Sequence, residues 1–216
     1  MSSIVRHKVG HHFYDGAQEA SSAKLGMWLF LVTEVLLFSG LFVAYTIIKT
    51  LNPEMWAEAS KELDVTLGTV NTVVLISSSL TVALAVRAAQ TNKAGEKNKQ
   101  IVGLLVVTLL CAAAFLVVKY FEYSHKFHVG TLPGPYYTFE GIAQPNAHLF
   151  FGVYFLMTGL HGIHVVIGMI VLSWVTIRAA KGHFYQDYYT PVELGGLYWH
   201  LVDLIWIYLF PLLYLV

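Results

Sequence analysis

The stretch ELGGLYWHLVDLIWIYLFPLLYLV, residues 193–216, decides the fold, because it is typical of a membrane-spanning helix that nevertheless carries ionisable side chains. Glu193 and His200 are seven residues apart and therefore lie on nearly the same helix face, and Asp203 lies one turn further along it. Ionisable groups at bilayer depth are costly and normally face a protein interior or a water-filled path. We therefore expect neighbouring helices to pack against this face.

The composition is that of an integral membrane protein. Of the 216 residues, 56% are hydrophobic and 12% are charged, and the mean hydropathy is +0.61. The 13 basic and 13 acidic residues balance to zero net charge, so nothing indicates a nucleic-acid partner. The single cysteine, Cys111, lies in an apolar run, which argues against a disulfide framework and against a cysteine-based metal site.

Five segments are long and apolar enough to cross the hydrocarbon core, which takes about 20 residues each. They are residues 25–48, 67–89, 101–120, 148–177 and 194–216. The sequence thus predicts an all-α integral membrane protein in which a polar N-terminal tail, residues 1–24, precedes one domain, a bundle of five transmembrane helices over residues 25–216.

The distribution of lysine and arginine predicts the orientation. If the N-terminus is inside, nine of the 13 basic residues lie on the cytoplasmic side and four on the other side. Because cytoplasmic loops are enriched in lysine and arginine, this bias predicts the N-terminus inside and the C-terminus outside.

Glu34 lies in the middle of the first predicted span, almost three turns beyond Lys24. Burial disfavours the charged form of a carboxylic acid, so an isolated Glu34 is expected to be neutral. Two roles stay open. Glu34 is either a proton-accepting or lipid-facing acid, or a protonated side chain hydrogen-bonded to a neighbouring helix.

Glu122 follows the third predicted span in a long aromatic connection, residues 119–147. Its charged and histidine neighbours are typical of an interfacial cluster at a membrane boundary. Two histidines without cysteines or a tight set of carboxylates do not predict a metal ion. The members of the cluster besides Glu122 are Lys119, His125, Lys126 and His128.

The fourth span carries His161 and His164, one turn apart, together with Gly152 and Gly159 two turns apart. We expect the histidines to form hydrogen bonds across helices and the glycines to offer a smooth face for another helix. A haem held by His161 or His164 with an opposing ligand, His200, stays open as a less favoured interpretation.

The remaining polar and aromatic residues inside the spans are expected to serve packing. Asn71 and Thr72 precede a run of serines in the second span, and hydroxyls and small side chains in lipid mainly allow helices to approach closely. Trp199 and Trp206 flank Asp203 in the last span and are expected to join the same interhelical contacts.

Several of these segments together resemble subunit III of the haem–copper cytochrome oxidases. They are KLGMWLFLVTEVLLF at 24–38, TVNT at 69–72 with the serines that follow, Glu122-Tyr123, TGLHGIHVVIG at 158–168 and YWHLVDLIW at 198–206. The resemblance covers essentially everything after Lys24 in the right order. It is to the five-span bacterial form, because the first two spans of the seven-span form are missing. In the seven-span form a cleft beside those two spans holds phospholipids. Here the cleft would be open or lined by another subunit, which leaves bound phospholipid as an expectation.

The resemblance implies a non-catalytic subunit of an oxygen-reducing, proton-translocating enzyme complex, without redox centres of its own. Haem and copper would belong to the catalytic subunit I, against which this chain would dock. Other oxidase subunits, membrane lipids and a respiratory supercomplex would complete its partners, in the cytoplasmic (inner) membrane of a bacterium. The implied role is to sustain proton uptake and to protect the catalytic subunit from inactivation during turnover. The candidates are Glu34, Glu122 and Glu193 for proton- or lipid-related roles, and Asn71, His161, His164, His200, Asp203, Trp199 and Trp206 for interhelical contacts.

Other functions remain as alternatives. The same fold could accompany a quinol oxidase or a nitric oxide reductase, since nothing in this subunit would bind the electron donor. A self-sufficient b-type cytochrome would use the histidine pair named above. A stand-alone proton-coupled transporter ranks last, because the sequence has no inverted repeats or broken helices.

Overall fold

The computed structural model describes residues 7–93 and 95–216. This part of the chain contains six α-helices, which are α1 (Gly16–Leu51), α2 (Pro53–Ala59), α3 (Val65–Gln90), α4 (Asn98–Val129), α5 (Ala147–Ala180) and α6 (Thr190–Tyr214). Two 3₁₀ turns, Ser60–Glu62 and Gly134–Tyr136, lie in the connections. Residues 1–6 of the predicted polar tail, including Arg6, lie outside the described residues.

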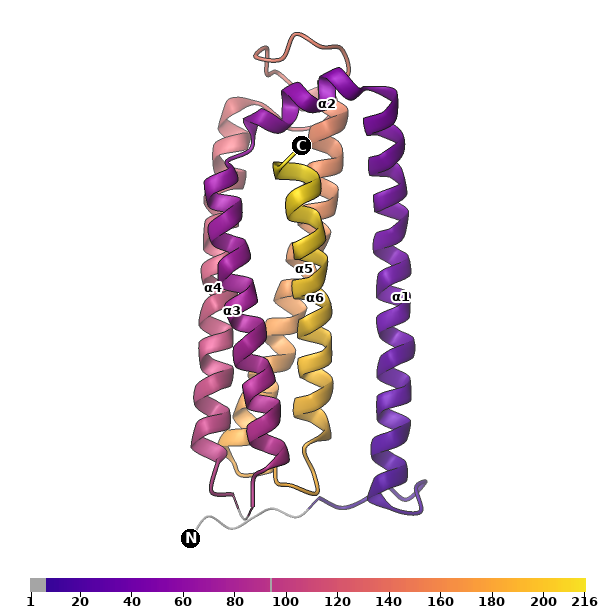
Figure 1. Cartoon of the computed structure of the whole chain (residues 1–216), viewed down its shortest axis with the longest axis vertical. Helices are drawn as coiled ribbons and strands as arrows, with labels where there is room; N and C mark the ends of the chain where they lie inside the picture. Colours follow the sequence, from indigo (N-terminus) through magenta and orange to yellow (C-terminus); the bar gives the residue numbers. More distant parts are fainter. Residues whose placement is uncertain (1–6, 94) are drawn as a thin grey trace.

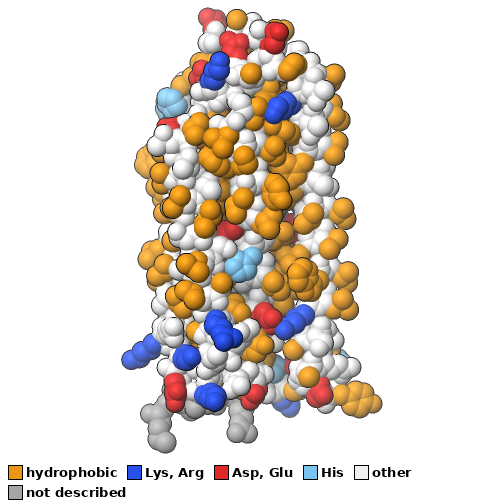
Figure 2. Space-filling view, in the orientation of Figure 1, with side chains coloured by type: hydrophobic (Ala, Val, Ile, Leu, Met, Phe, Trp, Pro, Cys, Tyr) orange, Lys and Arg blue, Asp and Glu red, His pale blue; other side chains and the backbone are white. Residues whose placement is uncertain are grey.

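Within the described residues, five helices (α1, α3, α4, α5 and α6) are long and apolar enough to cross a membrane. Hydrophobic side chains cover the middle of the face in Figure 2, and charged side chains gather mainly toward its two ends. The predicted all-α architecture with five spans is confirmed to this extent. The chain is a multi-pass helical membrane protein.

Two helix ends differ from the prediction. The first helix begins at Gly16 rather than at residue 25, because the Asp15 side chain caps it by accepting a hydrogen bond of 2.7 Å from the backbone N–H of Gln18. Helix α4, which contains the third predicted span, runs on to Val129 rather than ending at residue 120. It ends where Gly130 adopts a left-handed conformation. Part of the predicted tail and part of the predicted 119–147 connection are therefore helical.

Helices α3, α4, α5 and α6 form a four-helix group, and α1 runs beside it at a greater distance (Figure 1). Of the described residues of α1, Leu31, Phe38 and Tyr45 are the buried ones, and they recur every seven residues. One narrow seam thus joins α1 to α5 and α6. The Tyr45 hydroxyl reinforces it by donating a 2.8 Å hydrogen bond to the carbonyl of Leu212.

Glycine allows close helix packing at positions other than those predicted. A Cβ at Gly168 would lie 2.8 Å from the ring of Trp199, so α5 and α6 approach closely there. At Gly152 and Gly159, the nearest atoms to such a Cβ are 3.7 and 3.8 Å away, which is ordinary contact. The predicted smooth face at those two glycines is therefore not where a helix packs tightly.

The connection between α1 and α3 is itself structured. Helix α2 lies across the end of the bundle near the C-terminus (Figure 1). Its fully buried Trp56 packs between Tyr45 and Phe150, with ring centroids 4.8 Å away in both cases. The Ser60 hydroxyl then donates a 2.9 Å hydrogen bond to the carbonyl of Val216. We call this the C-terminal end of the bundle, and the opposite end the N-terminal end.

Asn92 joins two loops at the N-terminal end. Its amide nitrogen donates to the carbonyl of Phe184, at 2.8 Å, and its backbone carbonyl accepts from the N–H of Gln186, at 3.0 Å. Its side-chain oxygen also accepts from the N–H of Lys97, at 2.9 Å. One buried residue thereby fixes the α3–α4 loop against the α5–α6 loop.

Candidate functional site

Glu34 of α1 faces His164 of α5, and their Oε2 and Nε2 atoms are 2.7 Å apart. The other ring nitrogen of His164, Nδ1, is 2.8 Å from the carbonyl of Leu160. A carbonyl can only accept, so Nδ1 carries a hydrogen, and a neutral imidazole then has none on Nε2. The contact therefore contains one proton, held either by Glu34 or by a positively charged His164.

This pair changes the interpretation of Glu34. The sequence left open a proton-accepting or lipid-facing acid and a protonated side chain hydrogen-bonded to a neighbouring helix, and the structure gives Glu34 a histidine partner on α5. Phe38, one turn further along α1, packs edge-on against the His164 ring with centroids 5.2 Å apart. Phe38 and Glu34 of α1 thus both contact His164.

The three ionisable residues of the last span have different neighbours. Glu193 forms a 2.9 Å ion pair with Lys24 of α1. His200 Nδ1 lies 2.7 Å from the hydroxyl of Ser79 on α3. The face of α6 that carries Glu193 and His200 therefore packs against neighbouring helices, with Glu193 contacting α1 and His200 contacting α3.

Asp203 is buried in the seam between α6 and α3. One of its carboxyl oxygens, Oδ2, is 3.4 Å from the Ser78 hydroxyl. Trp199 donates a 3.0 Å hydrogen bond from its indole nitrogen to the same hydroxyl. Trp199 and Asp203 of α6 thus both contact Ser78 of α3.

Glu122, which the sequence placed in a cluster at a membrane boundary, is buried within the protein among polar partners from three helices. Lys119 Nζ donates to Glu122 Oε2 at 3.0 Å and to the Tyr214 hydroxyl at 2.6 Å. Tyr154 and Tyr214 donate to the other carboxyl oxygen of Glu122, at 2.8 and 2.6 Å. We call these four residues, from α4, α5 and α6, the Lys119 cluster.

The prediction missed Tyr154 and Tyr214 and did not anticipate that Lys119 is buried within the protein. The one available signal was the spacing of Lys119, Glu122 and Lys126, which puts all three on one helix face. All three are at most 8% exposed, so the helix continues because this face is buried. The helix therefore extends beyond the predicted span, which ends at residue 120, to Val129.

His161 does not form the predicted hydrogen bond across helices. Among residues 7–93 and 95–216, neither of its ring nitrogens has a hydrogen-bond partner. The ring instead packs against Trp206 and Phe115, with centroids 5.3 and 5.5 Å away. The histidines considered for haem, His161, His164 and His200, thus have three different surroundings.

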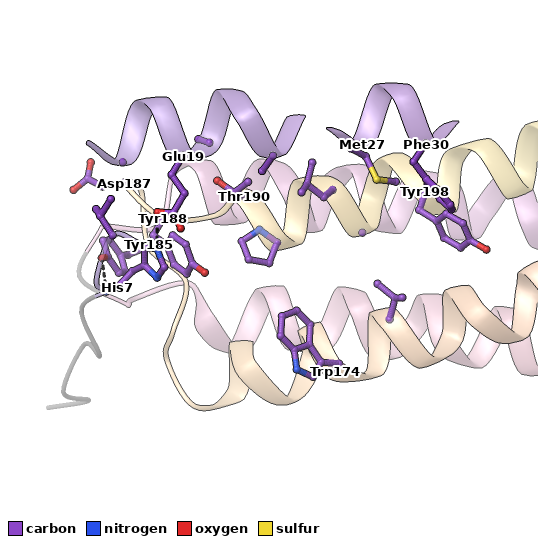
Figure 3. A pocket seen from close by; sticks show the side chains of 18 of the residues that line it. His7, Glu19, Met27, Phe30, Trp174, Tyr185, Asp187, Tyr188, Thr190 and Tyr198 are labelled. Carbon is purple, nitrogen blue, oxygen red and sulfur yellow. Dashed lines mark hydrogen bonds and ion pairs between the residues drawn. The ribbon is translucent and has the colours of Figure 1, made fainter. Parts of the chain in front are cut away.

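A cavity of about 660 Å³ separates α1 from α5 and α6 at the N-terminal end. Figure 3 shows Met27 and Phe30 of α1 across from Trp174 of α5, with Tyr188 near the end of the cavity. The ring of His7 stacks on Tyr188 with centroids 3.8 Å apart. Burial raises the pKa of the Tyr188 phenol above its usual value, so this group stays uncharged at neutral pH.

Fold and polar contacts together define a class, a multi-pass helical membrane protein whose intramembrane polar groups mostly bind one another between helices. Within that class the chain belongs to the cytochrome c oxidase subunit III family, whose family model matches residues 6–216. The resemblance inferred from the sequence is thereby confirmed.

Individual relatives cover most of the chain. A protein of Thermostichus vulcanus named cytochrome c oxidase subunit 3 is 33% identical over 192 residues, which cover 88% of this chain and 86% of the relative. A quinol oxidase subunit 3 of Bacillus subtilis is 30% identical over 88% of this chain and 85% of its own length. A heme-copper oxidase subunit I+III of Aeropyrum pernix is 29% identical over 88% of this chain, which corresponds to 22% of that longer protein.

Proposed function

We propose that this chain is a non-catalytic integral subunit of a respiratory cytochrome c oxidase and packs on the catalytic subunit that holds haem and copper. The observation that carries the proposal is family membership over residues 6–216. The Aeropyrum pernix relative, whose name joins subunits I and III in one protein, supports a direct contact with subunit I. Other oxidase subunits and membrane lipids, with phospholipid in the cavity beside α1, complete the proposed partners, and a respiratory supercomplex would be the larger assembly.

Gentle detergent extraction tests this assignment. A tagged form of the chain should co-purify with a haem- and copper-containing subunit, because its partner holds the redox centres. Once separated from that partner, the chain should be colourless and contain no stoichiometric iron, copper or zinc. One haem or copper per isolated chain, or purification of the chain without any partner, would overturn the proposal.

The finer role that we propose is to support proton uptake and turnover stability, with Glu34 as the first candidate. Its carboxyl group shares one proton with His164, which is the property that a proton-relaying or proton-buffering group needs. Glu122 and Glu193 are weaker candidates, because lysines neutralise both.

Replacing Glu34 with alanine should leave assembly intact but shorten the working lifetime of the oxidase or slow its proton uptake. Oxygen-consumption traces over many turnovers measure this effect. Glu96→Ala is a matched control, since it removes an exposed carboxylate from the α3–α4 loop. Identical traces for wild type, Glu34→Ala and Glu96→Ala would rule out the role of Glu34.

We propose that the chain lies in the cytoplasmic membrane of a bacterium with its N-terminus inside. The nine-to-four distribution of basic residues supports this orientation. A reporter fused after Val216 should then behave as external, and one inserted near Gly95 as cytoplasmic. The opposite behaviour at both positions would invert the orientation.

A quinol oxidase remains the second candidate, because one of the relatives carries that name at 30% identity. A subunit that co-purifies and binds cytochrome c would favour the first proposal, and a quinol-binding subunit would favour the second. A nitric oxide reductase complex would be recognised by its substrate in the same preparation.

A further inference from the structure

The interior of the α3–α6 group contains polar atoms that lack partners. Across residues 7–93 and 95–216, no hydrogen bond reaches the amide nitrogen or oxygen of Asn71, either ring nitrogen of His161, or Oδ1 of Asp203. All three residues are at most 2% exposed. Because buried polar groups in native proteins are almost always paired, five such atoms in one bundle core point to a ligand that completes them.

Trp206 connects the three residues in space. Its indole nitrogen donates a 3.1 Å hydrogen bond to Thr72, the residue next to Asn71 on α3. Its ring lies 5.3 Å, centroid to centroid, from that of His161 on α5. Asp203 precedes Trp206 by three residues and so lies one turn away on the same face of α6. Asn71, His161 and Asp203 thus belong to three helices, α3, α5 and α6, that meet at this tryptophan.

The second oxygen of Asp203 is also poorly satisfied. It lies 3.4 Å from the Ser78 hydroxyl, but that hydroxyl has a single hydrogen and a nearer acceptor, the carbonyl of Leu75 at 2.7 Å. The shorter contact takes the hydrogen. Within the described part of the chain, the shortest hydrogen bond to the Asp203 carboxyl group is therefore this long one from Ser78.

We propose that the core of the α3–α6 group binds ordered water between Asn71, His161 and Asp203. The amide of Asn71 offers donors and an acceptor, a neutral imidazole offers one of each, and the carboxyl group accepts, so water can complement all three. Buried waters in proteins typically make about three hydrogen bonds to such groups. The site shares no residue with the Glu34–His164 pair or with the Lys119 cluster, although the Trp206 ring lies 4.7 Å from the Lys119 ammonium group, and it does not depend on the proposed function.

Two substitutions at Asn71 distinguish a hydrated core from a dry one. In a dry core, Asn71→Leu replaces an unpaired amide with an apolar side chain of similar size and should be tolerated better than Asn71→Ala, which leaves a cavity. In a hydrated core the order reverses. Leucine displaces the water and leaves His161 and Asp203 unpaired, whereas alanine leaves room for a further water.

The measurement is the temperature at which the tagged chain is lost from solution when the detergent-solubilised complex is heated. We expect the leucine variant to be lost several degrees below the alanine variant. Leu75→Ala, at a fully buried apolar position one turn along α3, is the control that shows how the assay registers a cavity alone. Loss of the leucine variant at or above the temperature of the alanine variant overturns the proposal.

A map of the wild-type complex at a resolution that reveals water provides a second, independent test, even if neither Asn71 variant assembles. We expect ordered density within hydrogen-bonding distance of the Asn71 amide and a His161 nitrogen. Direct contact between these side chains, with no density between or beside them, would overturn the proposal.

Discussion

Replacing Lys119 with leucine should destabilise the chain by about 3–5 kcal/mol, because removing one partner of a buried ion pair leaves the other charge uncompensated. Lys119 and Glu122 are 8% and 5% exposed, and their charged atoms are 3.0 Å apart. The Tyr214 hydroxyl also loses its 2.6 Å contact with the ammonium group. Thermal loss of the chain from the purified complex is the measurement.

A double variant provides the control for this prediction. Combining Lys119→Leu with Glu122→Leu removes both charges, and apolar replacement of a whole buried pair is often neutral or stabilising. The double variant should therefore be more stable than Lys119→Leu alone. If its loss of stability equals the sum of the two single losses, the ammonium and carboxylate groups do not interact as described.

Truncating Trp206 to alanine should cost a similar amount, about 3–5 kcal/mol, as for other large buried side chains cut back to alanine. The indole is fully buried and lies 4.7 Å below the Lys119 ammonium group, and its ring centroid is 4.9 Å from that of Phe115. Its loss would open a cavity and leave Thr72 without its donor. Trp206→Phe should have an intermediate effect.

Trp28 provides the matched comparison. It lies on α1 and is 57% exposed, so its truncation to alanine removes little contact with the rest of the chain. Subunit retention on a sizing column after heating would compare the variants. Equal retention of Trp206→Ala and Trp28→Ala would contradict a central packing role for Trp206.

The sequence predicted the five spans because each is a long apolar run, and hydropathy detects such runs without any knowledge of tertiary contacts. The ends of the helices were harder to predict from the sequence than their existence. A capping contact at Asp15 marks the earlier start of α1. Helix α4, which contains the third predicted span, continues through the buried charges of Lys119 and Glu122 beyond the point at which hydropathy falls. These residues can be read from the sequence, but whether charged residues such as Lys119 and Glu122 lie within a helix or in a loop depends on which helix face is buried by its neighbours.

The partners of the polar residues could not be predicted from one sequence. Glu34 and His164 were both singled out, but nothing within either span indicated that α1 and α5 bring them together. The face containing Glu193 and His200 was predicted from helical spacing, whereas its division between α1 and α3 follows from the bundle arrangement. His161 appeared equivalent to its neighbour His164, but only one of them faces α1.

The narrow seam along α1 makes the surrounding hydrocarbon part of what holds this helix in place. Leu31, Phe38 and Tyr45 face the bundle, while most of the other apolar side chains of α1 are exposed on the surface of the chain. Apolar packing between helices gains little over packing against lipid chains, so the polar contacts that α1 makes with Glu193, His164 and the carbonyl of Leu212 supply much of its preference for one position. A solvent that fits the helix poorly, such as a short-chain detergent, would thus loosen α1 well before it disturbs the other four spans.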